Sequence, residues 1–164
     1  MDLTSPHLIH AAKLLAVPLS FALTGFSLAF STIAVPALYD LPASASAPTL
    51  VHIFRQGGTL VVPSTLLLTT TATYLSYIIP RQRRLWAFVA VAAVLPLPWT
   101  TAVMLPSNIS RLVEISEGGK AAQDRATANL EARQLLKKWV WQNYVRGGLV
   151  LAAGVAAVQA TLNA

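Results

Sequence analysis

The chain contains no cysteine, and only 11% of its 164 residues are charged. The absence of cysteine excludes disulfide bonds, thiolate catalysis and iron–sulfur ligation. A soluble domain has about 25% charged residues, whereas this chain is 55% hydrophobic with a mean hydropathy of +0.58. Acidic residues are also scarce, 6 against 12 basic ones, so the formal net charge is +6. The composition therefore indicates an integral membrane protein.

The positive charge is scattered along the chain, and its one dense run is Arg81-Gln-Arg-Arg84. A short basic loop between two apolar runs is typical of the cytoplasmic side of a membrane protein. We interpret the run as a topology signal rather than a nucleic-acid patch, and we expect no nucleic-acid partner. This orientation predicts that both termini are cytoplasmic.

Four apolar runs are long enough to cross a bilayer, which takes about 20 residues. They cover approximately residues 14–38, 57–79, 85–105 and 140–162 of a single domain, 1–164. A cleaved signal peptide is the alternative for the first run, but a signal core is only about 7–15 residues long. The predicted fold is all-α: a membrane four-helix bundle with a broken third helix and a long extramembrane helix leading into the fourth.

Two prolines, Pro96 and Pro98, lie inside the third run. They remove two backbone donors and predict a helix break just before Trp99. Because lipid tolerates a broken helix only where it faces protein or a cavity, we expect a cavity near Trp99, Thr100 and Met104.

Rows of small or hydroxyl-bearing residues predict packing faces in two other runs. Hydroxyls in a membrane helix usually bond to their own helix or to a neighbour. In the second run the hydroxyls lie at Thr65, Thr69, Thr73 and Ser76. In the last run small residues recur every four positions, at Gly148, Ala152, Ala156 and Ala160.

Polar side chains interrupt the apolar pattern on either side of the charged segment 119–138. Trp139, Asn143 and Arg146 share one helical stripe. A charge in lipid is expensive, so Arg146 must snorkel to the interface or face protein, water or a ligand. Asn108 has two interpretations: it caps a short helix ending at Gly118-Gly119, or it donates its amide into a site.

Connectivity places the end of the first span, the start of the second, the end of the third and the start of the fourth at one membrane face. The polar and aromatic residues there are Tyr39, Asp40, His52, Arg55, Gln56, Trp99, Thr100, Asn108, Trp139, Asn143 and Arg146. Convergent polar groups at one end of a helical bundle are typical of a small-molecule site. No metal site is predicted, because His7 and His10 lack a third ligand nearby.

Two segments resemble a known family: Pro98-Trp-Thr-Thr-Ala-Val-Met-Leu-Pro-Ser-Asn108 and Leu136-Lys-Lys-Trp-Val-Trp-Gln-Asn-Tyr-Val-Arg146. They resemble the anthrone oxygenase-like family of small integral membrane proteins. The family pattern has a Thr-x-x-Val-Met-x-Pro-Thr-Asn segment, followed by a Trp and a Val-Arg before the last helix. Ser107 stands where the family usually has Thr. The matching positions are Asn108, Trp139 and Arg146.

The resemblance implies a membrane-bound oxygenase that converts an anthrone-type polyketide to an anthraquinone with O₂ and no other cofactor. An anthrone has an acidic CH₂ group, and its enolate reacts with O₂ unaided. Trp99 and Trp139 would then flank the rings, and His52 would be the base, because imidazole titrates near neutral pH. The enolate oxygen would be held by Arg146, Asn108 and Asn143. The remaining expected substrate contacts are Tyr39, Arg55, Gln56, Thr100 and Met104.

The expected partners are the anthrone and the lipid bilayer, in an endomembrane such as the endoplasmic reticulum or a vesicle, with a homo-oligomer left open. Other classes of function remain at this point. One is a non-catalytic membrane scaffold, and another is a small-molecule binding or transport protein. A metal-dependent oxidase is the third, although no His/carboxylate cluster supports it.

Overall fold

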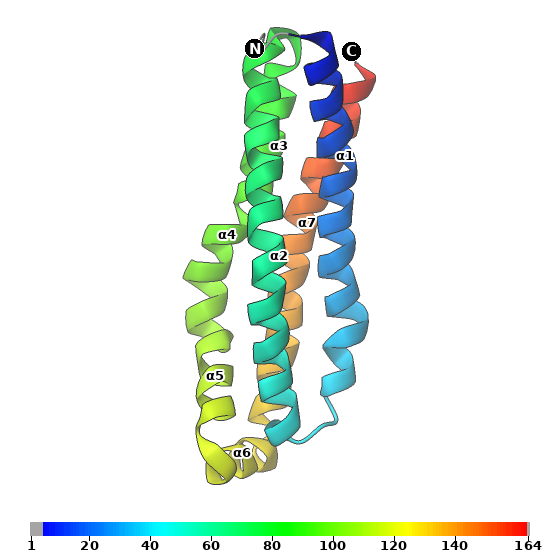
Figure 1. Ribbon diagram of the computed structural model, residues 1–164. Helices are drawn as coiled ribbons and strands as arrows, with labels where there is room; N and C mark the ends of the chain where they lie inside the picture. The colour runs from blue at the N-terminus through cyan, green and yellow to red at the C-terminus, as the bar shows by residue number, and fades with distance from the viewer. Residues whose placement is uncertain (1–4, 164) are drawn as a thin grey trace. The chain divides into compact units, whose positions relative to one another are not determined.

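The computed structural model describes residues 5–163, which are almost entirely helical (Figure 1). Helices make up 92% of the structure, and the described residues contain no strand. The elements in order are α1 (Pro6–Ala29), π-helix η1 (Phe30–Ala34), 3₁₀-helix η2 (Pro36–Leu38), α2 (Ala43–Ile78), 3₁₀-helix η3 (Pro80–Gln82), α3 (Arg83–Val94), α4 (Pro96–Trp99), π-helix η4 (Thr100–Ile109), α5 (Ser110–Glu117), α6 (Gly119–Ala128) and α7 (Glu131–Leu162). The predicted all-α class is confirmed.

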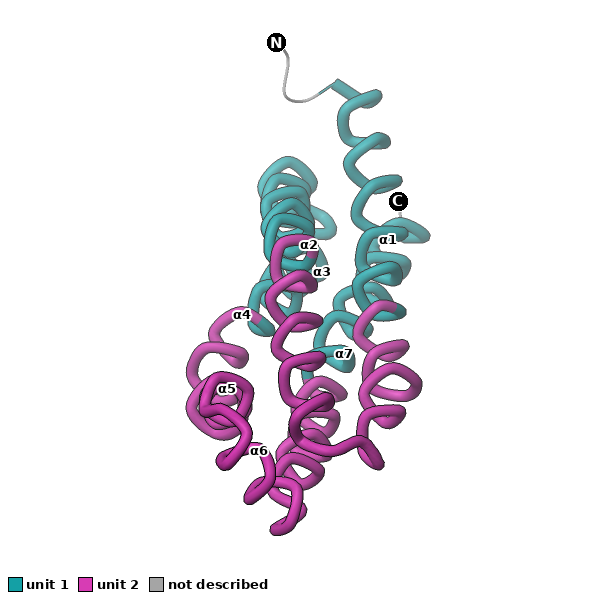
Figure 2. Tube along the Cα trace, turned by 60° about the horizontal axis from the view of Figure 1, so that its bottom comes forward, with its two compact units in different colours: residues 1–25, 61–96, 146–164 teal, residues 26–60, 97–145 magenta. Residues whose placement is uncertain are grey.

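The chain divides into two compact units, coloured separately in Figure 2. Unit 1 comprises residues 1–25, 61–96 and 146–164, and unit 2 comprises 26–60 and 97–145. The division passes through α1, α2, α4 and α7, so each of these helices supplies residues to both units. Each unit has an apolar core of its own.

Three helical segments are long and apolar enough to cross a membrane: Pro6–Leu38, Pro80–Glu117 and Glu131–Leu162. They contain three of the four predicted spans, and they identify a membrane protein. The remaining predicted span, 57–79, lies in α2, which is 36 residues long. Its many threonines lower its hydropathy relative to the other three segments.

The hydroxyls of α2 bond within their own helix, as predicted. Thr69 Oγ1 donates to the Thr65 carbonyl at 2.8 Å, and Thr73 Oγ1 donates to the Thr69 carbonyl at 2.8 Å. Ser76 Oγ donates to the Thr73 carbonyl at 2.7 Å. These bonds satisfy the hydroxyls without any partner helix, so this row serves the helix itself rather than a site.

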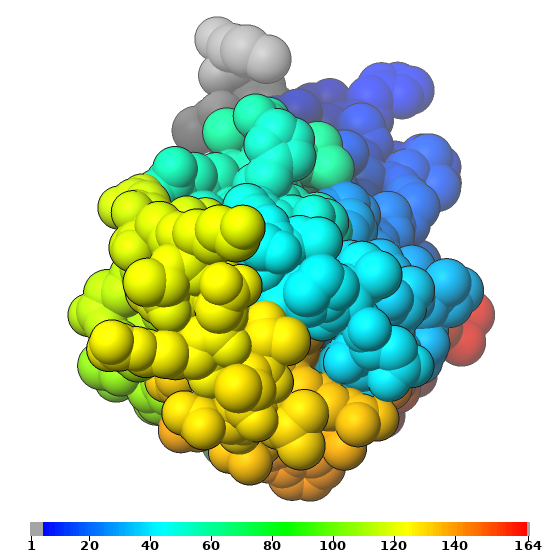
Figure 3. Space-filling model, turned by 90° about the horizontal axis from the view of Figure 1, so that it is seen from below, coloured from blue at the N-terminus to red at the C-terminus, as the bar shows by residue number. Residues whose placement is uncertain are grey.

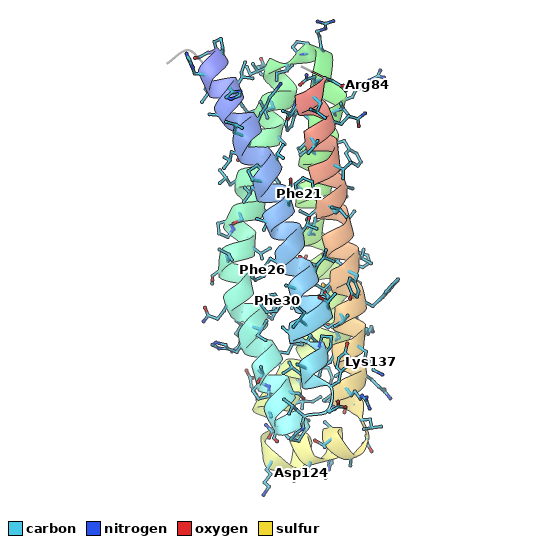
Figure 4. The ribbon with its side chains drawn as sticks, turned by 90° about the vertical axis from the view of Figure 1, so that its right-hand side faces the viewer. Phe21, Phe26, Phe30, Arg84, Asp124 and Lys137 are labelled. Atoms are coloured by element: carbon cyan, nitrogen blue, oxygen red, sulfur yellow. The ribbon has the colours of Figure 1, made fainter. Side chains whose placement is uncertain are left out.

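Close packing in unit 1 depends on Gly154 of α7. A Cβ atom there would lie 3.0 Å from Ser20 Oγ and 3.4 Å from the ring of Phe21, both on α1; Phe21 is labelled in Figure 4. The predicted every-fourth-residue face is wrong at its beginning, because Gly148 is exposed and Ala152 is only half-buried. Four residues advance a helix by about 40° more than one turn, so such a row drifts away from its neighbour. The buried row follows mixed spacing instead: Val150, Ala153, Ala157 and Ala160.

The third run is divided into helices differently from the prediction. Its first helix, α3, ends at Val94, where the Leu95 N–H still donates to the Val91 carbonyl at 3.1 Å. Pro96 then opens α4, whereas the sequence predicted a break just before Trp99. Proline is favoured in the first turn of a helix because its missing N–H is not needed there. Pro96 therefore begins α4, and this helix continues to Trp99, the residue before which the break was predicted.

The first turn of α2 is tied to a distant helix within unit 2. The Ala43 N–H donates to Thr127 Oγ1 at 2.8 Å, across 84 positions in the sequence. Thr127 Oγ1 in turn donates to the Gln123 carbonyl of α6 at 2.9 Å. Seen from below, α6 (yellow) and the start of α2 (cyan) lie side by side (Figure 3). The Thr127 side chain therefore satisfies a free donor at the N-terminus of α2.

Candidate functional site

A ten-residue π-helix, η4, supplies one wall of the candidate site in unit 2. Its wide turns are closed by bonds to the fifth preceding residue, such as Ser110 N–H to the Leu105 carbonyl. π-Helices are rare and often mark functional sites. Met104 and Asn108 of η4 are both fully buried, so this segment directs a thioether and an amide into the core of unit 2.

Asn108 donates to α7 instead of capping α5. Its Nδ2 donates to Gln142 Oε1 at 2.7 Å, and Gln142 Nε2 donates to Ser107 Oγ at 2.8 Å. The N-cap interpretation is wrong, because α5 begins at Ser110 after Ile109, without a side-chain cap. The Asn108 Oδ1 atom is buried and has no hydrogen-bond partner within residues 5–163.

Gln142 connects η4 to α7 at more than one point, although the sequence interpretation did not select it. Its backbone carbonyl accepts a bond from Trp99 Nε1 at 3.3 Å. Lys138, one turn earlier, donates from Nζ to the Ser107 carbonyl at 3.1 Å. The signal that could have found Gln142 is an amide three residues after Trp139 in an apolar helix, where it shares the face of Trp139.

Asn143 joins α7 to the end of α1 within the same unit. Its Nδ2 donates to the Ser27 carbonyl at 2.9 Å and to Ser31 Oγ at 2.8 Å. A primary amide has two N–H donors, so both are engaged within the protein. Asn143 would have to release one of these bonds to hold an oxyanion, and its observed role is to position α7.

Trp139 contributes an unpaired donor to the core of unit 2. The side chain is 4% exposed, and its Nε1 has no partner among the described residues. Trp139 lies one turn before Gln142, the residue that holds Asn108. Unit 2 therefore contains a buried unpaired donor, Trp139 Nε1, and a buried unpaired acceptor, Asn108 Oδ1. Such groups are rare in folded proteins and are costly to leave unsatisfied.

The other predicted contacts, Trp99 at the end of α4 and Thr100 and Met104 of η4, lie in the same unit. Trp99 and Thr100 are half-buried, and Thr100 Oγ1 lies 3.9 Å from the Met104 sulfur. A hydroxyl–thioether contact is weak, so Met104 acts mainly as an apolar, polarizable wall.

The structure places the predicted residues of α2 on the exposed surface. His52, Arg55 and Gln56 are all exposed. Arg55 Nη2 lies 3.2 Å from Glu117 Oε1, and both side chains are 64% exposed, so this ion pair contributes little to stability. His52, Arg55 and Gln56 are therefore not buried with the donor and acceptor described above. The role of His52 remains a prediction.

Tyr39 and Asp40 lie at the α1–α2 loop of unit 2. The ammonium of Lys137 lies 5.9 Å from the centre of the Tyr39 ring, a cation–π contact. Partial burial raises the pKa of the Tyr39 phenol, and the nearby Tyr144 raises it further, so the phenol stays protonated at neutral pH. Asp40 pairs with Arg133 at 3.4 Å, which gives its carboxylate a partner from its own unit.

Arg146 belongs to unit 1. It is half-buried, and its Nε atom is fully buried without a hydrogen-bond partner in the part of the chain that the structure describes. The described residues of unit 1 include no Asp or Glu at all. Among the described residues of unit 1, Arg146 therefore has no side-chain carboxylate to balance its charge.

The side chains do not gather into a metal-binding cluster. Over residues 5–163, no group of three or more His, Cys, Asp or Glu side chains is arranged to hold a metal ion. The buried polar side chains described above, Asn108, Gln142, Asn143 and Trp139, are all neutral.

A family model described as anthrone oxygenase matches residues 50–156. The chain belongs to the anthrone oxygenase family. No curated protein and no solved structure matches it. The resemblance carried by the two motif segments is confirmed, because both lie within the matched range of this anthrone oxygenase family member. Asn108, Trp139 and Gln142 also lie in that range, whereas Ser27 and Ser31 precede it.

Proposed function

We propose that the chain is a membrane-bound oxygenase that oxidises an anthrone to an anthraquinone with O₂. The observation that carries the proposal is the buried pair of unsatisfied groups, Trp139 Nε1 and Asn108 Oδ1, inside the region that matches the family. A water-excluded donor is suited to stabilise a developing oxyanion, because the protein has already positioned it before the reaction. The family description supports the oxygenase class.

The proposed reaction needs no added reductant. A base removes one proton from the CH₂ group of the anthrone, and the electron pair moves onto the carbonyl oxygen to form the enolate. O₂ adds at the former CH₂ carbon to give a peroxide. Loss of water from the peroxide leaves the second carbonyl, so one oxygen atom enters the product and the other leaves in water. Both hydrogens of the CH₂ group leave in that water, and the step balances without metal or flavin.

The site residues take complementary roles in this proposal. The Trp139 N–H holds the enolate oxygen, while the ring of Trp139 and that of Trp99 contact the flat substrate. Asn108 Oδ1 accepts a hydrogen bond from a hydroxyl of the substrate or of the peroxide. Gln142 is a positioning residue, because its Oε1 accepts a hydrogen bond from Asn108 Nδ2 and so fixes the Asn108 amide. Met104 supplies apolar surface.

Arg146 and His52 complete the proposal as charged participants. Arg146 would offset the enolate charge, and the absence of Asp and Glu from the described residues of unit 1 supports this role. His52, which is exposed on α2, remains the proposed base because a neutral imidazole can accept a proton.

We also propose the membrane arrangement that the four apolar runs predict: a four-span bundle with an interrupted third helix and a long extramembrane helix leading into the fourth. The threonine-rich run in α2 would be the least apolar of the four spans. Both termini would then be cytoplasmic, in an endomembrane where an aromatic polyketide substrate partitions. A second copy of the chain is a further candidate partner.

The test is the rate of anthrone oxidation with and without purified protein, followed as anthraquinone absorbance and O₂ uptake. The expected stoichiometry is one O₂ per anthrone. Trp139→Phe keeps an aromatic ring but removes the indole N–H, and it should lower the rate about 10²-fold. Trp141→Phe is the matched control, because Trp141 is 69% exposed on the same helix. Equal rates with and without protein would refute the oxygenase proposal and leave the scaffold and transport functions as the alternatives.

A further inference from the structure

Unit 2 contains a second feature that the proposed reaction does not use: a cavity of about 360 Å³ beside the α1–α2 loop. This volume lies within the range of small-molecule sites. The lining comes from the loop, the end of α6, Leu130 and the first turn of α7: Tyr39, Asp40, Leu41, Pro42, Ala43, Ala126, Thr127, Leu130, Ala132 and Arg133. These segments meet on the face shown in Figure 3.

The backbone at Leu130 helps to form the cavity wall. Leu130 has a φ of 56°, the left-handed conformation that residues other than glycine rarely adopt. It separates α6 from α7, and its side chain is 56% exposed at the cavity instead of being packed in the core. A strained residue that presents apolar surface to a cavity is typical of a ligand-binding position.

The arginine at the cavity has unused hydrogen-bonding capacity. Arg133 Nη2 lies 3.4 Å from Asp40 Oδ1, but no hydrogen bond of the Arg133 guanidinium is formed with any described residue. Arg111, also in unit 2, shows the contrast: it donates to Glu131 at 2.7 Å and to Glu114 at 2.9 Å. The Arg133 fork is therefore free to bind a planar anion through two parallel bonds.

The surroundings of Arg133 favour an aromatic anion over a simple one. Lys137 lies one turn beyond Arg133 on α7, above the ring of Tyr39; it is labelled in Figure 4. Among the residues that line the cavity, Arg133 is opposed by one carboxylate, Asp40, whose side chain is 88% exposed. Pro42 and Leu130 supply apolar walls, and the Tyr39 hydroxyl is a further donor.

We propose that this cavity binds a planar aromatic carboxylate or phenolate, with the anionic group on Arg133 and the rings against Pro42, Leu130 and Tyr39. In binding, the ligand replaces Asp40 as the partner of the guanidinium. The Asp40–Arg133 pair is solvent-exposed and lacks a hydrogen bond, so little is lost when it opens. This site takes its ligand from the aqueous side of unit 2, and it does not depend on the proposed oxidation.

The opposite charges of Arg133 and Asp40 predict opposite changes in naphthoate affinity when each residue is replaced by a neutral one. Equilibrium dialysis of 2-naphthoate against the full chain in detergent measures the affinity, with empty micelles as background and the neutral 2-naphthalenemethanol as a comparator. Arg133→Gln should weaken naphthoate binding about tenfold or more and leave the neutral comparator unchanged. Asp40→Asn should strengthen naphthoate binding, because it removes the competing carboxylate.

The matched control is Arg125→Gln, since Arg125 is an exposed arginine of α6 that does not line the cavity. The proposal holds if naphthoate affinity falls in Arg133→Gln, rises in Asp40→Asn and is unchanged in Arg125→Gln. It is overturned if Arg133→Gln and Arg125→Gln behave alike, or if Asp40→Asn weakens binding. Because all three side chains are exposed, the variants should fold. Anthrone turnover in Arg133→Gln reports on the oxidation separately.

Discussion

Replacement of Gln142 by methionine should destabilise the protein, because Gln142 holds η4 against α7. Methionine keeps the length of the side chain but removes the acceptor for Asn108 Nδ2 and the donor to Ser107 Oγ. The Trp99 bond to the backbone carbonyl of residue 142 should persist. The substitution therefore removes two side-chain hydrogen bonds and little packing.

Two estimates of the cost agree. A hydrogen bond contributes about 0.5–1.5 kcal/mol net to stability, so the loss of two gives about 1–3 kcal/mol. Hydrogen bonds between membrane helices average about 0.6 kcal/mol and reach about 1.7 kcal/mol each, which gives a similar sum. A cost of about 2 kcal/mol corresponds to a fall in Tm of roughly 4–8 °C for a chain of this size.

The assay is thermal unfolding in one detergent at one scan rate, followed by tryptophan fluorescence. Gln159→Met is the matched control, because Gln159 is exposed near the end of the same helix. Its Tm should be unchanged. Asn108→Leu combined with Gln142→Met should cost less than the sum of the two single changes, since the double variant leaves no unpaired amide from this bond. Equal Tm values for Gln142→Met and Gln159→Met would refute the reasoning.

Four further predictions concern the reaction and the topology. Arg146→Lys should keep the fold but lose about 10²–10³ in rate, because lysine lacks the planar fork; near-normal turnover would exclude Arg146 from enolate stabilisation. His52→Phe should slow turnover, because phenylalanine cannot accept a proton, and an unchanged rate would make His52 a surface residue. Turnover should survive a chelator, whereas loss of activity restored by one metal would contradict the cofactor-free reaction. Tags at the two termini should respond alike to protease in sealed vesicles, and different responses would rule out an even number of spans.

Hydropathy predicted the helical class, whereas the roles of the selected site residues remain predictions. Asn108, Asn143 and Trp139 are all buried as a site requires, because a polar group in such a helix must find a partner or a ligand. Their partners could not be predicted. The Asn108–Gln142 bond joins positions 34 residues apart, and nothing local to either residue specifies the other.

The errors came from backbone geometry. The π-helix η4 changes which of its residues face inward, and no propensity rule identifies ten consecutive residues with that geometry. The small-residue row beginning at Gly148 was drawn at a fixed spacing of four, which a helix of 3.6 residues per turn does not maintain along one face. Pro96 begins α4 because proline is favoured in the first turn of a helix. The run contains two prolines, Pro96 and Pro98, and the prediction placed the break after the second of them.

The bond between Ala43 and Thr127 also sets an order of events during synthesis. Translation proceeds at about 5–20 residues per second, so Thr127 leaves the ribosome roughly 4–17 s after Ala43, given their separation of 84 positions. Until then the first turn of α2 lacks its capping hydroxyl, although all residues of α2 have already been synthesised. Truncations that end before residue 127 should therefore leave the α1–α2 loop more open to proteases than it is in the full chain. The contact of α6 with this loop thus forms long after the loop itself has been synthesised, and Arg133 of α7, the partner of Asp40, follows later still.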